Sequence, residues 1–174
     1  MNVDFNTVLL FTLPSLITGG LAYMLIQKFI TNEAKKQMIE VRKENVKFSL
    51  PIRMQSYERI ILLLERIDPV SVINRVIKPG MTTKQIQFLI INTISEEFNH
   101  NITQQLYVSV NLWETVRKAK EDAIKLVSIT AGIVPPNADA MDFSRKLIEI
   151  QAEKQLYTSK IALDAVKQEV RTLF

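Results

Sequence analysis

The sequence contains an uncharged stretch of 23 residues near its start, from Phe5 to Gln27, between Asp4 and Lys28. As an α-helix this stretch would extend roughly 35 Å, and the hydrocarbon core of a bilayer is about 30 Å thick. A secretory signal peptide would carry basic residues before its apolar stretch and a small-residue cleavage site after it, and neither pattern occurs. The stretch therefore predicts a transmembrane helix within an anchor of residues 1–30. A buried core helix is the alternative that stays open.

Basic residues gather on one side of this stretch. No Lys or Arg precedes it, whereas six follow it: Lys28, Lys35, Lys36, Arg42, Lys43 and Lys47. By the positive-inside rule, this asymmetry predicts a single-pass protein with its N-terminus outside and everything after Lys28 in the cytoplasm. Ser15, Gly19 and Ala22 fall near one helical face, and small side chains allow a second span to approach closely, so this is a candidate span-packing face.

Residues 31–49 are rich in charge and lack Gly and Pro, so we expect the membrane helix to continue as a charged stalk. One face of the stalk has the 4, 3, 4, 3 spacing of a coiled-coil seam, with an Asn where a buried Asn would set the register: Ala34, Met38, Val41, Asn45 and Phe48. The run covers only about two heptads, so we favour a stalk face that packs against the chain's own domain. The basic residues also suit anionic lipid headgroups, which leaves a lipid-surface sensor as a further possibility.

Proline, glycine and capping residues divide residues 50–174 into predicted helices. Pro51 predicts a break in the helix. The helices expected after it are Pro51 to Ile67, Asp68-Pro69 to Ile77, Thr82 to Phe98, Asn101 to about Thr130, and a last helix of about 35 residues from Asn137. Thr82 and Gln85 have the spacing of a capping box. Lys78-Pro79-Gly80 predicts a turn. The last helix would be longer than one small domain, so we expect part of it to project or to pack against a partner.

No segment shows the two-residue alternation of a β-strand. The sequence thus predicts an all-α protein: an N-terminal transmembrane helix that continues into the stalk, then a cytoplasmic bundle (residues 50–174) of about four further helices with a long C-terminal helix. Tyr57, Tyr107 and Trp113 lie on or near apolar helical faces, and we expect them in the core.

The chain of 174 residues has no Cys, one His and four Gly. This composition excludes disulfides, thiol catalysis, cysteine-ligated metals, multi-histidine metal sites and glycine-rich phosphate loops. The chain has a net charge of +4, but in the predicted bundle the basic excess is small and interleaved with acidic residues, whereas nucleic-acid binding needs a concentrated basic surface. We therefore expect no catalytic residue, no cofactor, no metal and no nucleic-acid partner.

Glu97 and His100 fit a Glu-x-x-His pattern, which is half of the motif that two-metal helical bundles use. The single His leaves the motif incomplete within one chain, so we interpret the pair as a polar helix end. A membrane-tethered enzyme or ligand-binding bundle that uses Glu97 and His100 is the alternative function. Asn101-Ile102-Thr103 matches a glycosylation acceptor but lies on the predicted cytoplasmic side, and we interpret Asn101 as a helix cap.

Two blocks of sequence, Leu50–Arg59 continued by Leu64–Ile67, and Glu97–Ser109, resemble an uncharacterised family of small bacterial single-span membrane-anchored helical proteins. The resemblance implies architecture only. It marks seven residues as a candidate interaction surface: Arg53, Tyr57, Glu58, Arg59, His100, Gln104 and Gln105.

The expected function is that of a non-enzymatic scaffold or accessory subunit in the bacterial inner membrane. Its expected partners are the lipid bilayer and either a second copy of the chain or another protein of a membrane complex.

Overall fold

The computed structural model describes residues 5–153 and 158–173, without the side chains of residues 5–13, 15 and 158. Six α-helices and one 3₁₀-helix follow one another in these residues: α1 (Phe5–Arg66), α2 (Pro69–Val76), α3 (Thr83–His100), η1 (Ile102–Leu106), α4 (Val110–Ile133), α5 (Ala140–Glu153) and α6 (Thr158–Arg171). The described residues contain no β-strand, only an isolated bridge between Thr82 and Asp139. The prediction of an all-α protein is confirmed.

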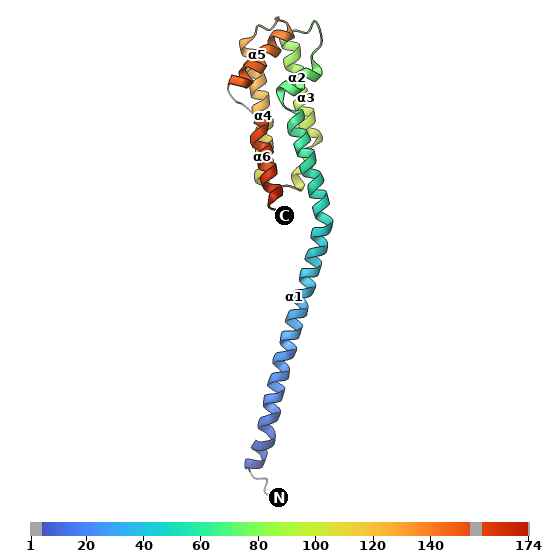
Figure 1. The fold of residues 1–174 in the computed structure, drawn as a ribbon, viewed down its shortest axis with the longest axis vertical. Coiled ribbons are helices and arrows are strands. Elements are labelled where there is room, and N and C mark those ends of the chain that lie inside the picture. Colours follow the sequence, from blue (N-terminus) through green and yellow to red (C-terminus); the bar gives the residue numbers. More distant parts are fainter. Residues whose placement is uncertain (1–4, 154–157, 174) are drawn as a thin grey trace. The chain divides into compact units, whose positions relative to one another are not determined.

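The chain divides into two units, Met1–Leu50 and Pro51–Phe174. Helix α1 begins in the first unit and ends in the second (Figure 1). The predicted continuation of the first helix through the stalk is confirmed, but the predicted break at Pro51 is wrong. Pro51 and Lys47 are both exposed, so water can reach the Lys47 carbonyl, which loses its backbone donor. The neighbours on both sides lack Gly and Pro and continue the helix.

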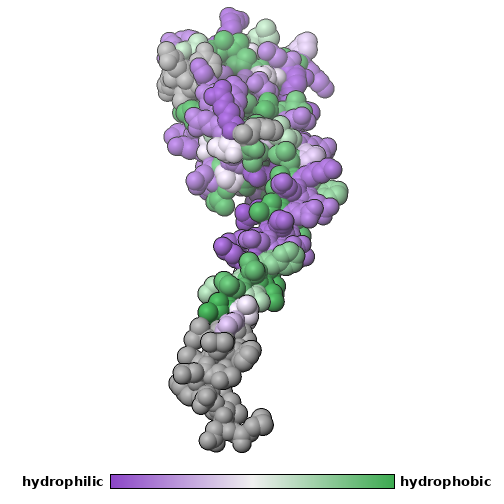
Figure 2. All heavy atoms as spheres, turned by 60° about the horizontal axis from the view of Figure 1, so that its bottom comes forward, coloured by the Kyte–Doolittle hydropathy of each residue, from purple (hydrophilic) through white to green (hydrophobic). Residues whose placement is uncertain are grey.

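In the first unit, every described side chain between Leu16 and Ser49 is exposed. Figure 2 shows hydrophobic side chains on the surface of this part of α1. Among the described residues, no helix combines the length and the apolar character that crossing a membrane requires. The predicted span of residues 5–27 falls partly on residues 5–13 and 15, whose side chains lie outside the described ones. On the stalk face, the side chains of Met38, Val41 and Phe48 are exposed.

Local capping signals place the starts of α2 and α3. The Asp68 carboxylate accepts a hydrogen bond from the Ser71 backbone N–H (3.0 Å), with Pro69 as the first helical residue. Thr82 and Gln85 form the predicted capping box at the start of α3. Gly80 has a φ of 81°, a conformation that glycine adopts at little cost, and it lies in the predicted turn.

The helix predicted from Asn101 onward begins instead at Val110. Ser109 is the N-cap, because its hydroxyl accepts from the Leu112 N–H (3.2 Å). The Asn101 side chain is used at the end of α3, where its amide donates to the Glu97 carbonyl (2.9 Å), and it makes no capping hydrogen bond to η1. The interpretation of Asn101 as the cap of a long helix is therefore wrong.

The helix predicted from Asn137 begins instead at Ala140, where the Asp139 carboxylate accepts a hydrogen bond from the Met141 N–H (2.8 Å). The described residues of this region form α5 and α6, and residues 154–157 lie outside the description. Helix α6 packs against α4 (Figure 1). This packing buries Ala162 and Val166 in the core, which removes the reason to expect a projecting C-terminal helix.

The core of Pro51–Phe174 gathers apolar side chains from all six α-helices, among them Ile60, Ile73, Ile90, Val127, Phe143 and Val166. Tyr57 and Trp113 are buried as predicted, and the Trp113 and Phe98 rings lie 5.3 Å apart. Tyr107 is 40% exposed, so its predicted place in the core is wrong. It follows η1, which leaves it outside the faces that pack between helices.

Candidate functional site

The Glu169 carboxylate on α6 joins three segments of Pro51–Phe174. One of its oxygens accepts from the Tyr57 hydroxyl of α1 (2.8 Å) and from the Ser109 backbone N–H (2.9 Å). Its other oxygen accepts from the Ser109 hydroxyl. Tyr57 is 1% exposed and belongs to the core, so the hydrogen bond between Tyr57 and Glu169 lies at the edge of the apolar core.

Arg53 completes this group, which we call the Glu169 cluster: Arg53, Tyr57, Ser109 and Glu169. The Arg53 guanidinium donates to the Tyr57 hydroxyl (2.9 Å) and to the Tyr107 carbonyl (3.1 Å). It lies 3.8 Å from the Glu169 carboxylate. Tyr57 thus accepts from Arg53 and donates to Glu169, and each polar side chain of the cluster has a partner.

The cluster shifts two pKa values in opposite directions. Burial raises the pKa of the Tyr57 phenol, and the neighbouring Glu169 carboxylate raises it further against the opposing effect of Arg53. Burial also acts to raise the pKa of Glu169, but the hydrogen bonds from Ser109 and Tyr57, together with the Arg53 charge, lower the pKa overall. At neutral pH the carboxylate is ionised and the phenol neutral, which suits a fixed clamp rather than a proton donor and acceptor.

A shallow depression of about 560 Å³ adjoins the Glu169 cluster. Its lining includes polar side chains of α4 and α6, such as Asn111, Thr115 and Gln168. Because Arg53 and Glu169 are already engaged within the cluster, this lining offers amide and hydroxyl groups rather than an available charge.

Glu97, which the sequence pairs with His100, is engaged elsewhere. Its carboxylate lies 2.7 Å from the Arg66 guanidinium and 3.8 Å from that of Arg75. His100 is exposed at the end of α3. Within the described residues, no group of three or more His, Asp or Glu could hold a metal ion.

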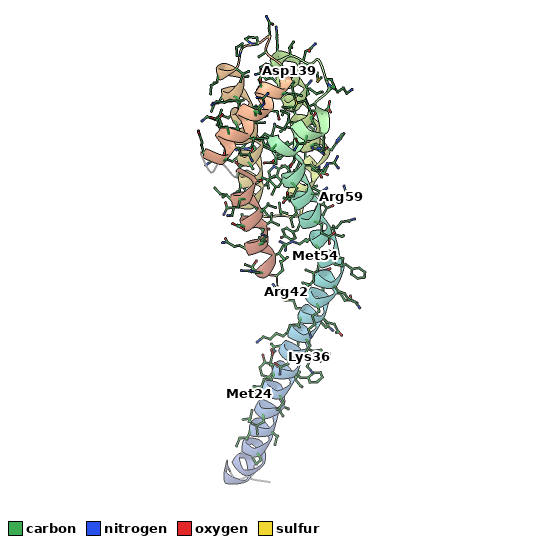
Figure 3. All side chains as sticks on the ribbon, turned by 45° about the horizontal axis from the view of Figure 1, so that its top comes forward. Met24, Lys36, Arg42, Met54, Arg59 and Asp139 are labelled. Atoms are coloured by element: carbon green, nitrogen blue, oxygen red, sulfur yellow. The ribbon has the colours of Figure 1, made fainter. Side chains whose placement is uncertain are left out.

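The seven residues of the candidate interaction surface do not form one site. Arg53 and Tyr57 come together in the Glu169 cluster, whereas Glu58 and Arg59 are exposed on α1. Figure 3 shows Arg59 on the outer side of this helix. Gln104 is buried in η1, and its neighbour Gln105 is exposed.

The candidate span-packing face is only partly described. Gly19 and Ala22 are exposed, and nothing lies within 4 Å of a Cβ built on Gly19. The side chain of Ser15 lies outside the described residues.

Sequence reasoning missed Ser109 and Glu169. Ser109 had a readable signal, because a Ser directly before a helical run is a preferred N-cap. Glu169 had none, since it is one acid among several on an amphipathic helix, and its partner Tyr57 precedes it by 112 residues.

An exposed apolar segment extends from η1 to the first residue of α4. We call it the η1 patch: Ile102, Leu106, Tyr107 and Val110. Leu106 and Val110 are 76% and 78% exposed. The segment is held in place by the Glu169 cluster, because Arg53 binds the Tyr107 carbonyl and Glu169 binds Ser109.

The model of a family of unknown function (DUF7935) matches residues 3–173, almost the whole chain. Neither a curated protein nor a solved structure matches the chain. The expectation of an uncharacterised family is confirmed. This chain belongs to the DUF7935 family.

Proposed function

We propose that this protein is a non-enzymatic scaffold or accessory subunit of the bacterial inner membrane. In this proposal residues 5–27 cross the membrane, the N-terminus is outside, and Pro51–Phe174 binds a protein partner in the cytoplasm.

The uncharged stretch of residues 5–27 and the basic residues that follow it support the membrane anchor. The exposed apolar side chains of α1 add to this support. Leu16, Leu21, Leu25 and Phe29 are each more than half exposed, and four such side chains on one isolated helix are costly in water. Lipid removes that cost.

The η1 patch is the observation that carries the partner-binding part of the proposal. Fully burying one such side chain contributes about 1.5–3 kcal/mol, so a partner that covers Leu106 and Val110 gains substantial affinity. The Glu169 cluster holds the segment in one conformation before binding, which lowers the entropic cost of association. Two residues that the family resemblance marks border the η1 patch. Gln105 directly precedes Leu106 in the chain, and Arg53 donates a hydrogen bond to the Tyr107 carbonyl.

Site-specific photo-crosslinking in intact cells tests this proposal. A photoreactive residue at Leu106 or Val110 should give one discrete adduct with another protein, and the same residue at Met141 or Ile148 on α5 should give none. These control positions are also exposed and apolar. Leu106→Asp should weaken co-purification of that partner by about 2 kcal/mol, or roughly thirtyfold.

Met141→Asp is the matched control and should retain the partner. Equal adducts from η1 and α5, or unchanged co-purification with Leu106→Asp, would refute the proposal.

A further inference from the structure

The stalk face of α1 exposes apolar side chains. Met38 and Phe48 are each 74% exposed and Val41 is 59% exposed, although all three recur at coiled-coil spacing on one side of the helix. Among the described residues of Met1–Leu50, this face has no apolar partner, although its pattern of apolar residues calls for one.

The spacing assigns each seam residue a heptad position. Met38 and Asn45 occupy a positions, and Ala34, Val41 and Phe48 occupy d positions. A single Asn at an a position is unfavourable against an apolar partner but pairs well with another Asn at the same level. The chain that supplies such an Asn in register is a second copy of this one.

The charges beside the seam distinguish the two possible orientations. In a parallel pair, position g of one helix faces position e of the next heptad in the other, which places Gln37 near Arg42 and Glu44 near Ser49. These pairs bring no like charges together. An antiparallel pair places e beside e, which opposes Lys35 and Arg42 of the two helices. The basic residues Lys36 and Lys43 are at f positions, on the side away from the seam.

We propose that residues 34–48 of α1 pair with the same residues of a second copy in a parallel, in-register coiled coil, with Asn45 beside Asn45. This inference rests on the proposed membrane anchor for its strength, because two heptads alone bind weakly. Anchors in one membrane confine both stalks to a thin layer with the same orientation, which raises their effective concentration.

Disulfide crosslinking of the full chain in native membranes tests the pairing, and the absence of Cys gives a clean background. Val41→Cys on the seam is compared with Ile39→Cys at a b position, since the two residues are similarly exposed, at 59% and 55%. The dimer fraction should be at least about tenfold higher for Val41→Cys. In a Phe48→Cys background, Val41→Glu should abolish the dimer and Ile39→Glu should preserve it.

Equal crosslinking at positions 39 and 41 would overturn the coiled coil. Crosslinks between Ala34→Cys and Phe48→Cys chains, without self-crosslinks at either position, would overturn the parallel register. If no crosslinks form while the chain still sediments with membranes, the pairing is refuted and the membrane anchor is retained. If they form in a chain that is not in the membrane fraction, the pairing stands and the anchor fails.

Discussion

Glu169 connects helices that are distant in sequence but adjacent in Pro51–Phe174. Its carboxylate receives three hydrogen bonds from two residues, Tyr57 and Ser109, and is only 16% exposed. An ionised acceptor strengthens such bonds, and losing it would leave the buried Tyr57 hydroxyl without its acceptor. This one side chain therefore holds α6 to both α1 and the start of α4.

Glu169→Gln should lower the free energy of unfolding at pH 7 by about 1–3 kcal/mol, because charge-assisted hydrogen bonds become neutral ones. The pKa of Glu169 is lower in the folded protein than its ordinary value of 4.5. Its contribution to stability is therefore complete above pH 4.5 and is lost as the pH falls through the folded-state pKa. Chemical denaturation over a pH series measures this effect. The free energy of unfolding should fall at acid pH in the native chain and should depend less on pH in Glu169→Gln.

Glu149→Gln provides the matched control, because Glu149 is half exposed and pairs with the nearby Lys146. Its effect should stay below about 0.5 kcal/mol. Equal destabilisation by the two variants would show that the Glu169 cluster contributes no more than a surface ion pair.

At the scale of elements, α1 shows that a helix can tolerate an internal proline. Pro51 removes one helical hydrogen bond, whereas Pro69 occupies the first position of α2, where its missing N–H has no helical partner to lose. The same residue type is therefore unfavourable at one position and favourable at the other.

Pro51→Ala should raise the free energy of unfolding of the full chain by about 2 kcal/mol, and Pro69→Ala should lower it by about 0.5–1 kcal/mol. Thermal unfolding in mild detergent measures both changes. Hydrogen exchange at residues 47–55 should slow in the first variant. A lower melting temperature for Pro51→Ala would mean that the helix does not continue through position 51 under those conditions.

The elements also show which sequence signals were sufficient. Asp68 and Thr82 cap their helices through contacts with residues three positions away, so both starts were predicted from local sequence. Asn101 does not cap a long helix, because its side chain donates to the Glu97 carbonyl at the end of α3 and Ser109 caps α4. Ser109 also binds Glu169, a residue 60 positions later that no local pattern reveals. In the candidate site, the family resemblance marked Arg53 and Tyr57, which lie one helical turn apart and share a hydrogen bond. It did not mark their long-range partner.

At the scale of the whole molecule, the basic residues of Met1–Leu50 all lie within residues 28–47. Residues 28–47 carry six basic and three acidic side chains, and Figure 3 labels Lys36 and Arg42 among them. A positive cluster directly after an apolar stretch supports the orientation that we propose.

Introduced single cysteines test this topology. A membrane-impermeant maleimide should label Asn2→Cys in intact cells and Lys160→Cys only after lysis, because the first position is expected outside and the second inside. Labelling with impermeant reagent before and after permeabilisation measures both. The opposite pattern would reverse the orientation.

The bond between Tyr57 and Glu169 also constrains the order of events during synthesis. Glu169 follows Tyr57 by 112 residues, which take roughly 6–22 s to translate, so the Tyr57 segment of α1 waits that long for the α6 residues that complete its core. The proposed anchor leaves the ribosome well before this. The bundle would then close beside the bilayer, with nascent apolar faces that must be shielded from each other and from lipid until the last helix arrives.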